Sequence, residues 1–246
     1  MSVYSNKEIL AGIEEGHIVC FPLNKDYIRG SSVDITLGEY FFACDRKNTT
    51  LGAYNPFDKE DVMRYFEGPL KAESNIDWCE RHKREPFVNI PPDHPVIVLR
   101  PRERILAHSH EFIGIYPPGT TEMRARSTWG RNGIAVCLCA GWGDPGFINR
   151  WTMEVLNTND EPVPLPVGER IAQLIFHTTG EVLGSYGEEG KYQSGTDLKK
   201  IVYEWDPSMM LPKSYTDQRR LPDPTSPESV EDYFQEVARL RKEHWR

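Results

Sequence analysis

Short apolar runs separated by Gly and Pro are the dominant pattern along this chain. Residues 17–119 contain HIVCFPL, SSVDITLGEYFFAC, PVIVLRP, RILAHS and FIGIYPPG, and residues 121–179 contain GIAVCLCAG, RWTMEVLNT, PVPLPVG and RIAQLIFHT. Several of these runs alternate apolar with polar positions and are rich in β-branched and aromatic residues, as strands are. Short strands at roughly ten-residue spacing with Gly/Pro turns indicate a β-sandwich, a jelly roll or a barrel.

Helical spacing occurs at both ends of the chain. Ser5 is suited to cap a helix with an apolar stripe at Ile9, Leu10 and Ile13 and an end at Gly16. The last segment has acidic residues early and basic residues late, as the helix dipole favours. We expect this tail helix to dock on its own core or on a neighbouring subunit. Its apolar residues recur with helical spacing at Val230, Tyr233, Phe234, Val237 and Leu240.

The composition changes twice along the chain, and this predicts its domain organisation. Residues 47–92 are polar and rich in charges, with helical potential around Lys59–Phe66, and we interpret them as a surface insertion. Five prolines between residues 207 and 227 indicate an extended linker. We therefore expect one main domain over residues 1–205, and a Pro-rich linker with a C-terminal helix over residues 206–246.

Charge and hydropathy exclude several classes of protein. With 29 basic and 37 acidic side chains the formal net charge is −8, which argues against a binder of nucleic-acid backbones. No apolar run is long enough to span a membrane, and the first residues do not resemble a signal peptide. We expect the protein in the cytoplasm, or in the host cytoplasm if it is viral.

The five cysteines are odd in number and scattered, so a disulfide framework is not expected. Cys137 and Cys139 lie on one face of a strand if that run is a strand, and we interpret them as buried thiols. No second Cys/His pair stands at zinc-site spacing. Phosphate-binding Gly-rich loops, the G-x-S-x-G elbow and the H-x-E signature of zinc deaminases are also absent. Any chemistry is expected to run without zinc.

The remaining candidate residues lie between residues 124 and 193. The run around Arg126, Ser127, Thr128 and Arg131 combines guanidinium and hydroxyl donors, which suit a triphosphate, although a solvated loop explains it equally well. Asp144 stands in a Gly/Pro-rich turn, where an Asp usually caps the backbone.

Glu154 interrupts an apolar strand and shares a face with Thr152 and Leu156. On an open sheet face it would be solvated, whereas inside a barrel or at a subunit seam desolvation would raise its pKa towards the range of proton transfer. The segment Lys191–Gln193 follows a Gly/Ser/Glu loop, and it is either a mobile segment that covers a ligand or a plain surface loop.

Six motifs occur in a familiar order. They are Gly30-Ser-Ser-Val-Asp34, Arg126-Ser-Thr-x-x-Arg131, Ala140-Gly-Trp-x-Asp144, Thr152-x-Glu154, Gly168-x-Arg-Ile-x-Gln173 and Lys191-Tyr-Gln193. Together they resemble the dCTP deaminase branch of the dUTPase/dCTP deaminase superfamily, over roughly residues 5–195. Arg131 and Glu154 favour this branch over plain dUTPases, and Ala140-Gly-Trp142 is similar to members that also form dUMP.

The resemblance implies a distorted jelly roll, a dUTPase-like β-clip barrel, that forms a homotrimer with active sites between subunits. Glu154 would be the general base that activates water for attack at cytosine C4, with Ser127 and Arg131 positioning water and base. Asp144 would contact the deoxyribose and serve diphosphate removal if that occurs. Mg²⁺ would arrive with the triphosphate. The resemblance assigns nucleotide binding to Arg126, Ser127, Thr128, Arg131, Asp144, Thr152, Met153, Gln173, Tyr186, Lys191, Tyr192 and Gln193.

Several positions depart from the family pattern. Ser194-Gly195 replaces a Gly-Gln pair, Gly143 stands where an aliphatic residue is usual, Ile148-Asn-Arg150 replaces a basic-Gly pair, and Thr36 replaces a basic residue. The expected activity is hydrolytic deamination of a deoxycytidine nucleotide, dCTP above others, with or without diphosphate release. The alternatives are a dUTP diphosphatase, or a non-catalytic trimer that binds a nucleotide or a protein.

Overall fold

The computed structural model describes residues 2–44, 52–193, 195–217 and 225–244. The chain divides into two compact units, residues 1–213 and residues 214–246, and each is described by itself. The first unit therefore includes residues 206–213 of the predicted linker, in which Met210 and Leu211 are buried. Pro222 and Pro224, two of the five linker prolines, lie outside the described residues. The predicted division at residue 205 stays a prediction.

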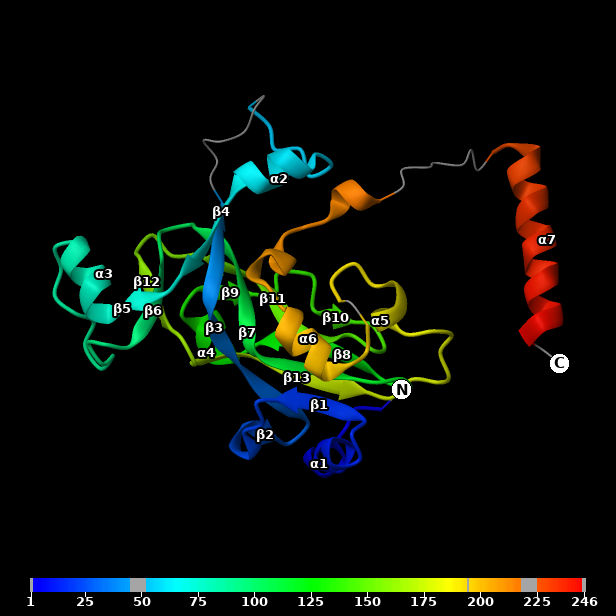
Figure 1. Ribbon diagram of the computed structural model, residues 1–246, viewed down its shortest axis with the longest axis horizontal. Coiled ribbons are helices and arrows are strands. Elements are labelled where there is room, and N and C mark those ends of the chain that lie inside the picture. The colour runs from blue at the N-terminus through cyan, green and yellow to red at the C-terminus, as the bar shows by residue number, and fades with distance from the viewer. Residues whose placement is uncertain (1, 45–51, 194, 218–224, 245–246) are drawn as a thin grey trace. The chain divides into compact units, whose positions relative to one another are not determined.

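Antiparallel strands form the first unit (Figure 1), and the predicted mainly β, jelly-roll-like fold is confirmed. The described residues form one ten-stranded sheet with the order β10-β8-β13-β3-β7-β11-β9, to which β1, β2 and β4 add at β7 or β3. Its strands are β1 Ile18–Phe21, β2 Ile28–Arg29, β3 Ser32–Cys44, β4 Phe66–Lys71, β7 Arg104–Ile115, β8 Thr120–Ala125, β9 Ile134–Val136, β10 Trp142–Gly143, β11 Ile148–Asn157 and β13 Arg170–His177.

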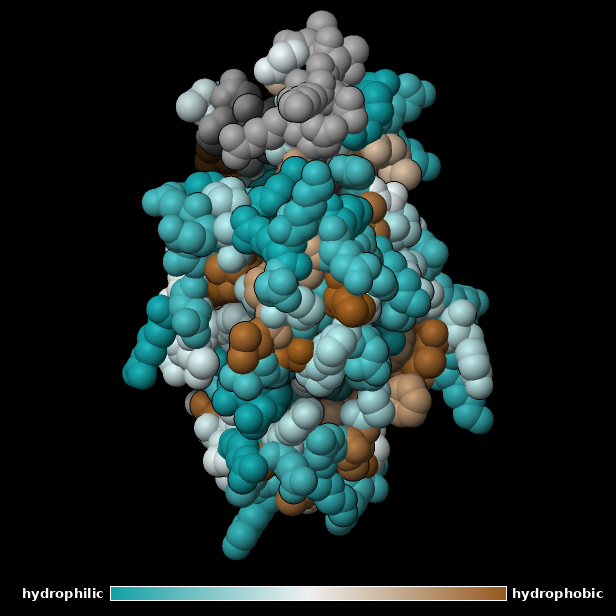
Figure 2. Space-filling view, turned by 90° about the vertical axis from the view of Figure 1, so that its left-hand side faces the viewer, coloured by the Kyte–Doolittle hydropathy of each residue, from teal (hydrophilic) through white to brown (hydrophobic). Residues whose placement is uncertain are grey.

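A second, three-stranded sheet has the order β12-β6-β5. Its strands are β5 Glu73–Ser74, β6 Pro95–Leu99 and β12 Val163–Pro166. The helix α3, Asn75–Arg81, follows β5 directly. Hydrophilic side chains cover most of this side of the molecule, and hydrophobic ones are scattered among them (Figure 2).

The predicted N-terminal helix is confirmed as α1, Asn6–Glu14. Ser5 and Glu8 form a capping box, in which the Ser5 amide donates to the Glu8 carboxylate at 2.7 Å and the Glu8 amide donates to the Ser5 hydroxyl at 3.4 Å. Ile9 is fully buried, and Gly16 ends the helix with a left-handed φ of 76° that suits glycine.

The predicted insertion contains strands as well as helices. The expected helix is present as α2, Lys59–Tyr65, but β4 then pairs with β3, and β5 pairs with β6. The first residues of this segment, 47–51, lie outside the described residues. The pairing partners lie at least about 20 residues away in sequence, so local pattern alone did not indicate these strands.

The second unit contains the predicted tail helix as α7, Pro227–His244. Its side chains Val230, Tyr233, Phe234 and Leu240 are exposed in the described structure, so the docking of this helix stays a prediction. No helix among the described residues combines the length and the apolar character that a membrane crossing needs.

A bulge in β7 determines how β11 lies in the sheet. Arg150 pairs with Phe112 and Thr152 with His108, so residues 109–111 of β7 face Trp151 alone. The Ser109 hydroxyl accepts a hydrogen bond from the Trp151 amide at 2.8 Å and donates to the Glu111 carbonyl at 2.7 Å. The runs RILAHS and FIGIYPPG are therefore one strand interrupted by a bulge, and not two strands.

The same bulge is tied to β3. The Glu111 carboxylate is buried and accepts hydrogen bonds from the Thr36 amide at 2.9 Å and the Thr36 hydroxyl at 2.7 Å. Thr36, a departure from the family pattern, is thus the partner of a buried acid. Beyond the bulge, Met153 and Val155 are buried in the core, and the alternate residues 150, 152, 154 and 156 share the opposite face.

Replacing Ser109 with Ala is expected to lower the free energy of unfolding by about 1–3 kcal/mol, because the Trp151 amide and the Glu111 carbonyl would lose a buried partner. Urea denaturation measures the change. Ser208→Ala, which removes an exposed hydroxyl, is the matched control and should change stability by less than about 0.5 kcal/mol. Equal stability of the two variants would contradict the role given to the bulge.

Candidate functional site

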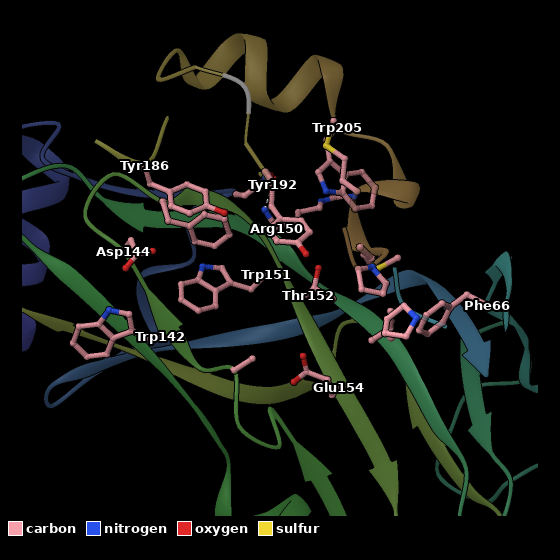
Figure 3. A pocket seen from close by; sticks show the side chains of 18 of the residues that line it. Phe66, Trp142, Asp144, Arg150, Trp151, Thr152, Glu154, Tyr186, Tyr192 and Trp205 are labelled. Carbon is pink, nitrogen blue, oxygen red and sulfur yellow. Dashed lines mark hydrogen bonds between the residues drawn. The ribbon is translucent and has the colours of Figure 1, made fainter. Parts of the chain in front are cut away.

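A cavity of about 520 Å³ opens on the outer face of β11. We call it the β11 pocket (Figure 3). Strand β11 contributes Arg150, Thr152 and Glu154, and the turn before it contributes Asp144. The remaining walls come from the insertion, strand β7, residues 140–142, the segment around Tyr186 and Tyr192, and residues 205–212. The other lining residues are Tyr54, Pro56, Phe66, Arg104, Leu106, Ala140, Trp142, Phe147, Asn149, Trp151, Trp205, Met209, Met210 and Pro212.

Glu154 is the acid of this pocket. Burial raises the pKa of its carboxyl above the ordinary value of 4.5, although the nearby Arg104 guanidinium acts in the opposite direction. One carboxylate oxygen, Oε2, is buried and has no hydrogen-bond partner among the described residues. Of the two alternatives that the strand pattern left for Glu154, solvated or desolvated, the structure shows the desolvated one. The carboxyl is therefore suited to exchange a proton with a ligand.

Asp144 lies at another end of the pocket, close to Tyr186 in Figure 3. Its side chain is exposed and caps no backbone amide among the described residues, so the expectation of a backbone cap does not hold. The Phe147 ring packs edge-on against the Tyr186 ring with their centroids 5.1 Å apart. A free carboxylate beside an aromatic pair offers an acceptor and an apolar surface together.

The departure at Gly143 has a packing explanation. A Cβ atom at this position would lie 2.5 Å from the Trp151 ring and 2.3 Å from the Thr121 hydroxyl oxygen. The Trp151 indole, which donates to the Ile113 carbonyl at 3.0 Å, occupies the space that a larger side chain at residue 143 would need. The small residue at position 143 therefore makes room for the large Trp151 ring.

The segment Lys191–Gln193 covers one edge of the pocket. The Gln193 amide group is buried and fully engaged, since its oxygen accepts from the Ile148 amide at 2.7 Å and its nitrogen donates to the carbonyls of Gly146 and Gly195. The side-chain amide nitrogen of Asn149 donates a hydrogen bond to the Tyr192 carbonyl at 2.8 Å. The predicted covering segment is thus hydrogen-bonded to the start of β11.

A second group of predicted residues lies away from this pocket. Arg126 and Arg170 each donate to the Asp34 carboxylate at 3.1 Å, and Gln173 is paired with Asp34 in the sheet. Ser127, Thr128 and Arg131 lie on the short helix α4, Ser127–Arg131, and their side chains are exposed. Within the part of the chain that the structure describes, none of these residues lines the β11 pocket.

A family model described as dCTP deaminase-like matches residues 3–179 of this chain. The chain belongs to this family. It is 32% identical over 213 residues to "dCTP deaminase, dUMP-forming" of Methanosphaera stadtmanae, with coverage of 84% of this chain and 97% of that protein. It is 33% identical over 181 residues to the protein of the same name from Methanobrevibacter smithii, with coverage of 72% and 81%.

The fold is similar to that of the solved 2'-deoxycytidine 5'-triphosphate deaminase from Agrobacterium tumefaciens, with a TM-score of 0.50 and 14% identity. The match covers 74% of this chain and half of the length of that chain. This likeness shows the fold alone. The matched family region ends at residue 179, so the helices α5, Tyr186–Glu189, and α6, Leu198–Glu204, and the residues after them lie beyond it.

Sequence analysis of this dCTP deaminase-like chain missed several pocket residues. Tyr54 and Phe66 come from the predicted surface insertion, and Trp205 and Met209 come from the predicted end of the domain and the linker after it. Their signal was the unusual aromatic and Met content of segments that are otherwise polar. Arg150 was noted only as a departure from the family pattern, because nothing in the sequence showed that its strand face lines a pocket.

The interpretation of Cys137 and Cys139 as buried thiols on one strand face is wrong for Cys139. Strand β9 ends at Val136 because Cys137 has a left-handed φ of 54°, so Cys139 is exposed and Cys137 is only half-buried. All five cysteines are free thiols. Within the described residues, no group of three or more His, Cys, Asp or Glu side chains is placed to hold a metal ion.

The raised pKa of Glu154 predicts a pH-dependent stability difference. The folded state holds this proton more tightly than the unfolded state, so the stabilisation is complete below the ordinary pKa of 4.5 and is lost as the pH rises through the raised value. We expect the unfolding free energy of the wild type, relative to that of Glu154→Gln, to fall across this window. Urea titrations at several pH values measure it, and parallel pH profiles of the two proteins would contradict the burial of this carboxyl.

Proposed function

We propose that this protein is an enzyme that deaminates dCTP hydrolytically and also releases diphosphate, so that its product is dUMP. Glu154 carries the proposal, because it is a desolvated carboxyl with an unpartnered oxygen inside a pocket large enough for a nucleotide. Family membership and the dUMP-forming relatives support the choice of substrate and product. A carboxyl of raised pKa suits a reaction in which one group takes a proton and later returns it.

In the proposed mechanism Glu154 takes a proton from a water molecule, and the water oxygen attacks C4 of cytosine. The ring then holds both the new hydroxyl and the original amino group on a tetrahedral carbon. Glu154 returns its proton to the amino nitrogen, ammonia leaves, and the hydroxyl proton passes to N3 as the C4 carbonyl forms. Desolvation favours the neutral carboxyl and strengthens its basicity once it is charged, so the same environment supports both steps.

The rest of the pocket would bind the nucleotide. Thr152 and the Met153 backbone lie on β11 between Arg150 and Glu154, where they would contact the base. Asp144 would accept a hydrogen bond from the deoxyribose and would serve as the base for water attack on the α-phosphate. Tyr186 and Tyr192 would pack against the sugar, and Lys191 would contact the phosphates. Gln193 would act indirectly, since its amide group already holds the backbone around it.

Ser127, Thr128 and Arg131 would reach the pocket from a neighbouring subunit. They are exposed on α4 and lie outside the β11 pocket of their own chain, although the reaction needs donors that position the water and the base. We therefore propose a homotrimer in which each site combines Glu154 of one chain with α4 of the next. Arg126 and Gln173 would bind phosphates in the same way, with Mg²⁺ as the counter-ion of the triphosphate.

The activity has a direct test. We expect ³¹P NMR of the wild type with dCTP and Mg²⁺ to show diphosphate and a monophosphate, with ammonia released in equal amount. Glu154→Gln should lower deamination by about 10²–10⁴-fold or more and keep nucleotide affinity, because only the titrating function is lost. Glu181→Gln, which changes an exposed carboxyl outside the pocket, is the control and should keep activity. Turnover of Glu154→Gln within a few-fold of that of the wild type would contradict the proposed mechanism.

If each active site is built from two chains, mixing two inactive variants should restore activity. Arg131→Met and Glu154→Gln should each be inactive alone. In a trimer with both kinds of chain, one interface combines an intact Glu154 with an intact Arg131, so about one third of wild-type activity should return. Co-expression with two affinity tags isolates such mixed trimers, and light scattering checks their mass. Mixed trimers without activity would show that the site is built within one chain.

A further inference from the structure

Arg150 lies in the β11 pocket, and its guanidinium group has no anionic partner among the described residues. Its Cζ atom lies 5.0 Å from the centroid of the Phe112 ring and 4.5 Å from that of the Trp205 ring. Its Nε atom is buried and unpartnered, and no ion pair involves its guanidinium within the part of the chain that the structure describes. A half-buried cation held only by two aromatic faces is an unsatisfied binding group.

The two carboxylates that act electrostatically on Arg150 already have other partners. Glu39 forms an ion pair with Lys71 at 3.1 Å, and Glu111 accepts both hydrogen bonds of Thr36 described above. His108, which packs against Trp205, is neutral, because burial lowers its pKa to about 4. The surroundings of Arg150 therefore do not neutralise its charge, and His108 beside it supplies no competing cation.

We propose that Arg150 binds the phosphate groups of the nucleotide in the β11 pocket. This inference rests on the proposed function for the identity of the nucleotide, but not for the presence of an anion. A guanidinium group presents a planar fork of donors that matches phosphate oxygens, and a water-excluded site strengthens that contact. Burial also weakens the hold of water on this cation, so a bound phosphate replaces less solvation than at an exposed arginine.

The position of Arg150 along β11 favours a phosphate over the base. Arg150, Thr152 and Glu154 alternate on one strand face, and the Cα atoms of the first and the last are about 13 Å apart at the rise of an extended strand. Figure 3 shows Glu154 and Arg150 at opposite ends of this row. If the reacting edge of the base lies at Glu154, the sugar and phosphates extend towards Arg150.

The neighbouring segment supports the same direction. Asn149 binds the carbonyl of Tyr192, so Lys191–Gln193 lies over the end of β11 that carries Arg150. Trp205 comes from the residues beyond the family match and holds the guanidinium from one side. The segment after α6 would thus orient a phosphate-binding arginine.

The test measures nucleotide binding without turnover, in the Glu154→Gln background, by isothermal titration calorimetry. Arg150→Gln should weaken binding of dCTP by about 10- to 100-fold and leave binding of deoxycytidine, measured by competition, unchanged. Arg150→Lys keeps the charge without the fork, so it should reduce dCTP affinity selectively but less. Arg102→Gln, which changes an exposed arginine paired with Asp160 at 2.8 Å, is the control and should change neither affinity.

Three results would overturn the proposal. Equal loss of dCTP and deoxycytidine affinity would place Arg150 at the base or show a general loss of structure. Unchanged affinity for both ligands in folded Arg150→Gln would make the arginine structural. If Arg150→Gln does not fold, the ratio of the two affinities in Arg150→Lys decides, and an unchanged ratio overturns the assignment. A wild type that binds dCTP with this dependence but deaminates no cytosine nucleotide would instead refute the proposed function and leave Arg150 as its phosphate contact.

Discussion

The bulge at residues 109–111 is the constraint on which the rest of the site depends. It lets three residues of β7 face a single residue of β11, and its polar groups are satisfied only because Ser109 binds Trp151 and Glu111 binds Thr36. A shift of β11 by one residue would turn Glu154 into the core and Met153 into the pocket. The hydroxyl of one serine and the carboxylate of one glutamate therefore help to hold β11 in the register that keeps Glu154 on the pocket face.

The pocket separates two desolvated charges of opposite sign. Glu154 and Arg150 share a strand face with their Cα atoms about 13 Å apart, and neither is among the groups that shift the pKa of the other. Burial consequently raises the pKa of Glu154 and lowers that of Arg150, and each group keeps its capacity for a ligand. Two such groups at adjacent positions of one strand face, two residues apart, would be close enough to form an ion pair.

The strand pattern, the first helix and the tail helix could be predicted from the sequence because they depend on local periodicity. The strand face on which Glu154 lies could be predicted from the alternation of apolar and polar residues. The resemblance of the chain to family motifs named most of the candidate residues. The contributions of Tyr54, Phe66 and Trp205 could not be predicted, since they depend on packing between segments that are far apart in sequence. The end of β9 at Val136 could not be predicted either, because the left-handed backbone of the next residue, Cys137, has no sequence signal.

The covering segment shows how the departure after Gln193 is compatible with a formed site. Gln193 binds three backbone groups, and Lys213 donates its backbone amide to the Tyr192 hydroxyl at 3.1 Å and its ammonium to the Lys191 carbonyl at 2.7 Å. Contacts that a nucleotide would otherwise have to supply are thus made by the chain itself. Less ordering of the segment then remains to oppose binding, because its conformational entropy is already lost on folding. Gly195 stands where the family pattern has a second glutamine, and in this chain Lys213 contributes to holding the segment in place.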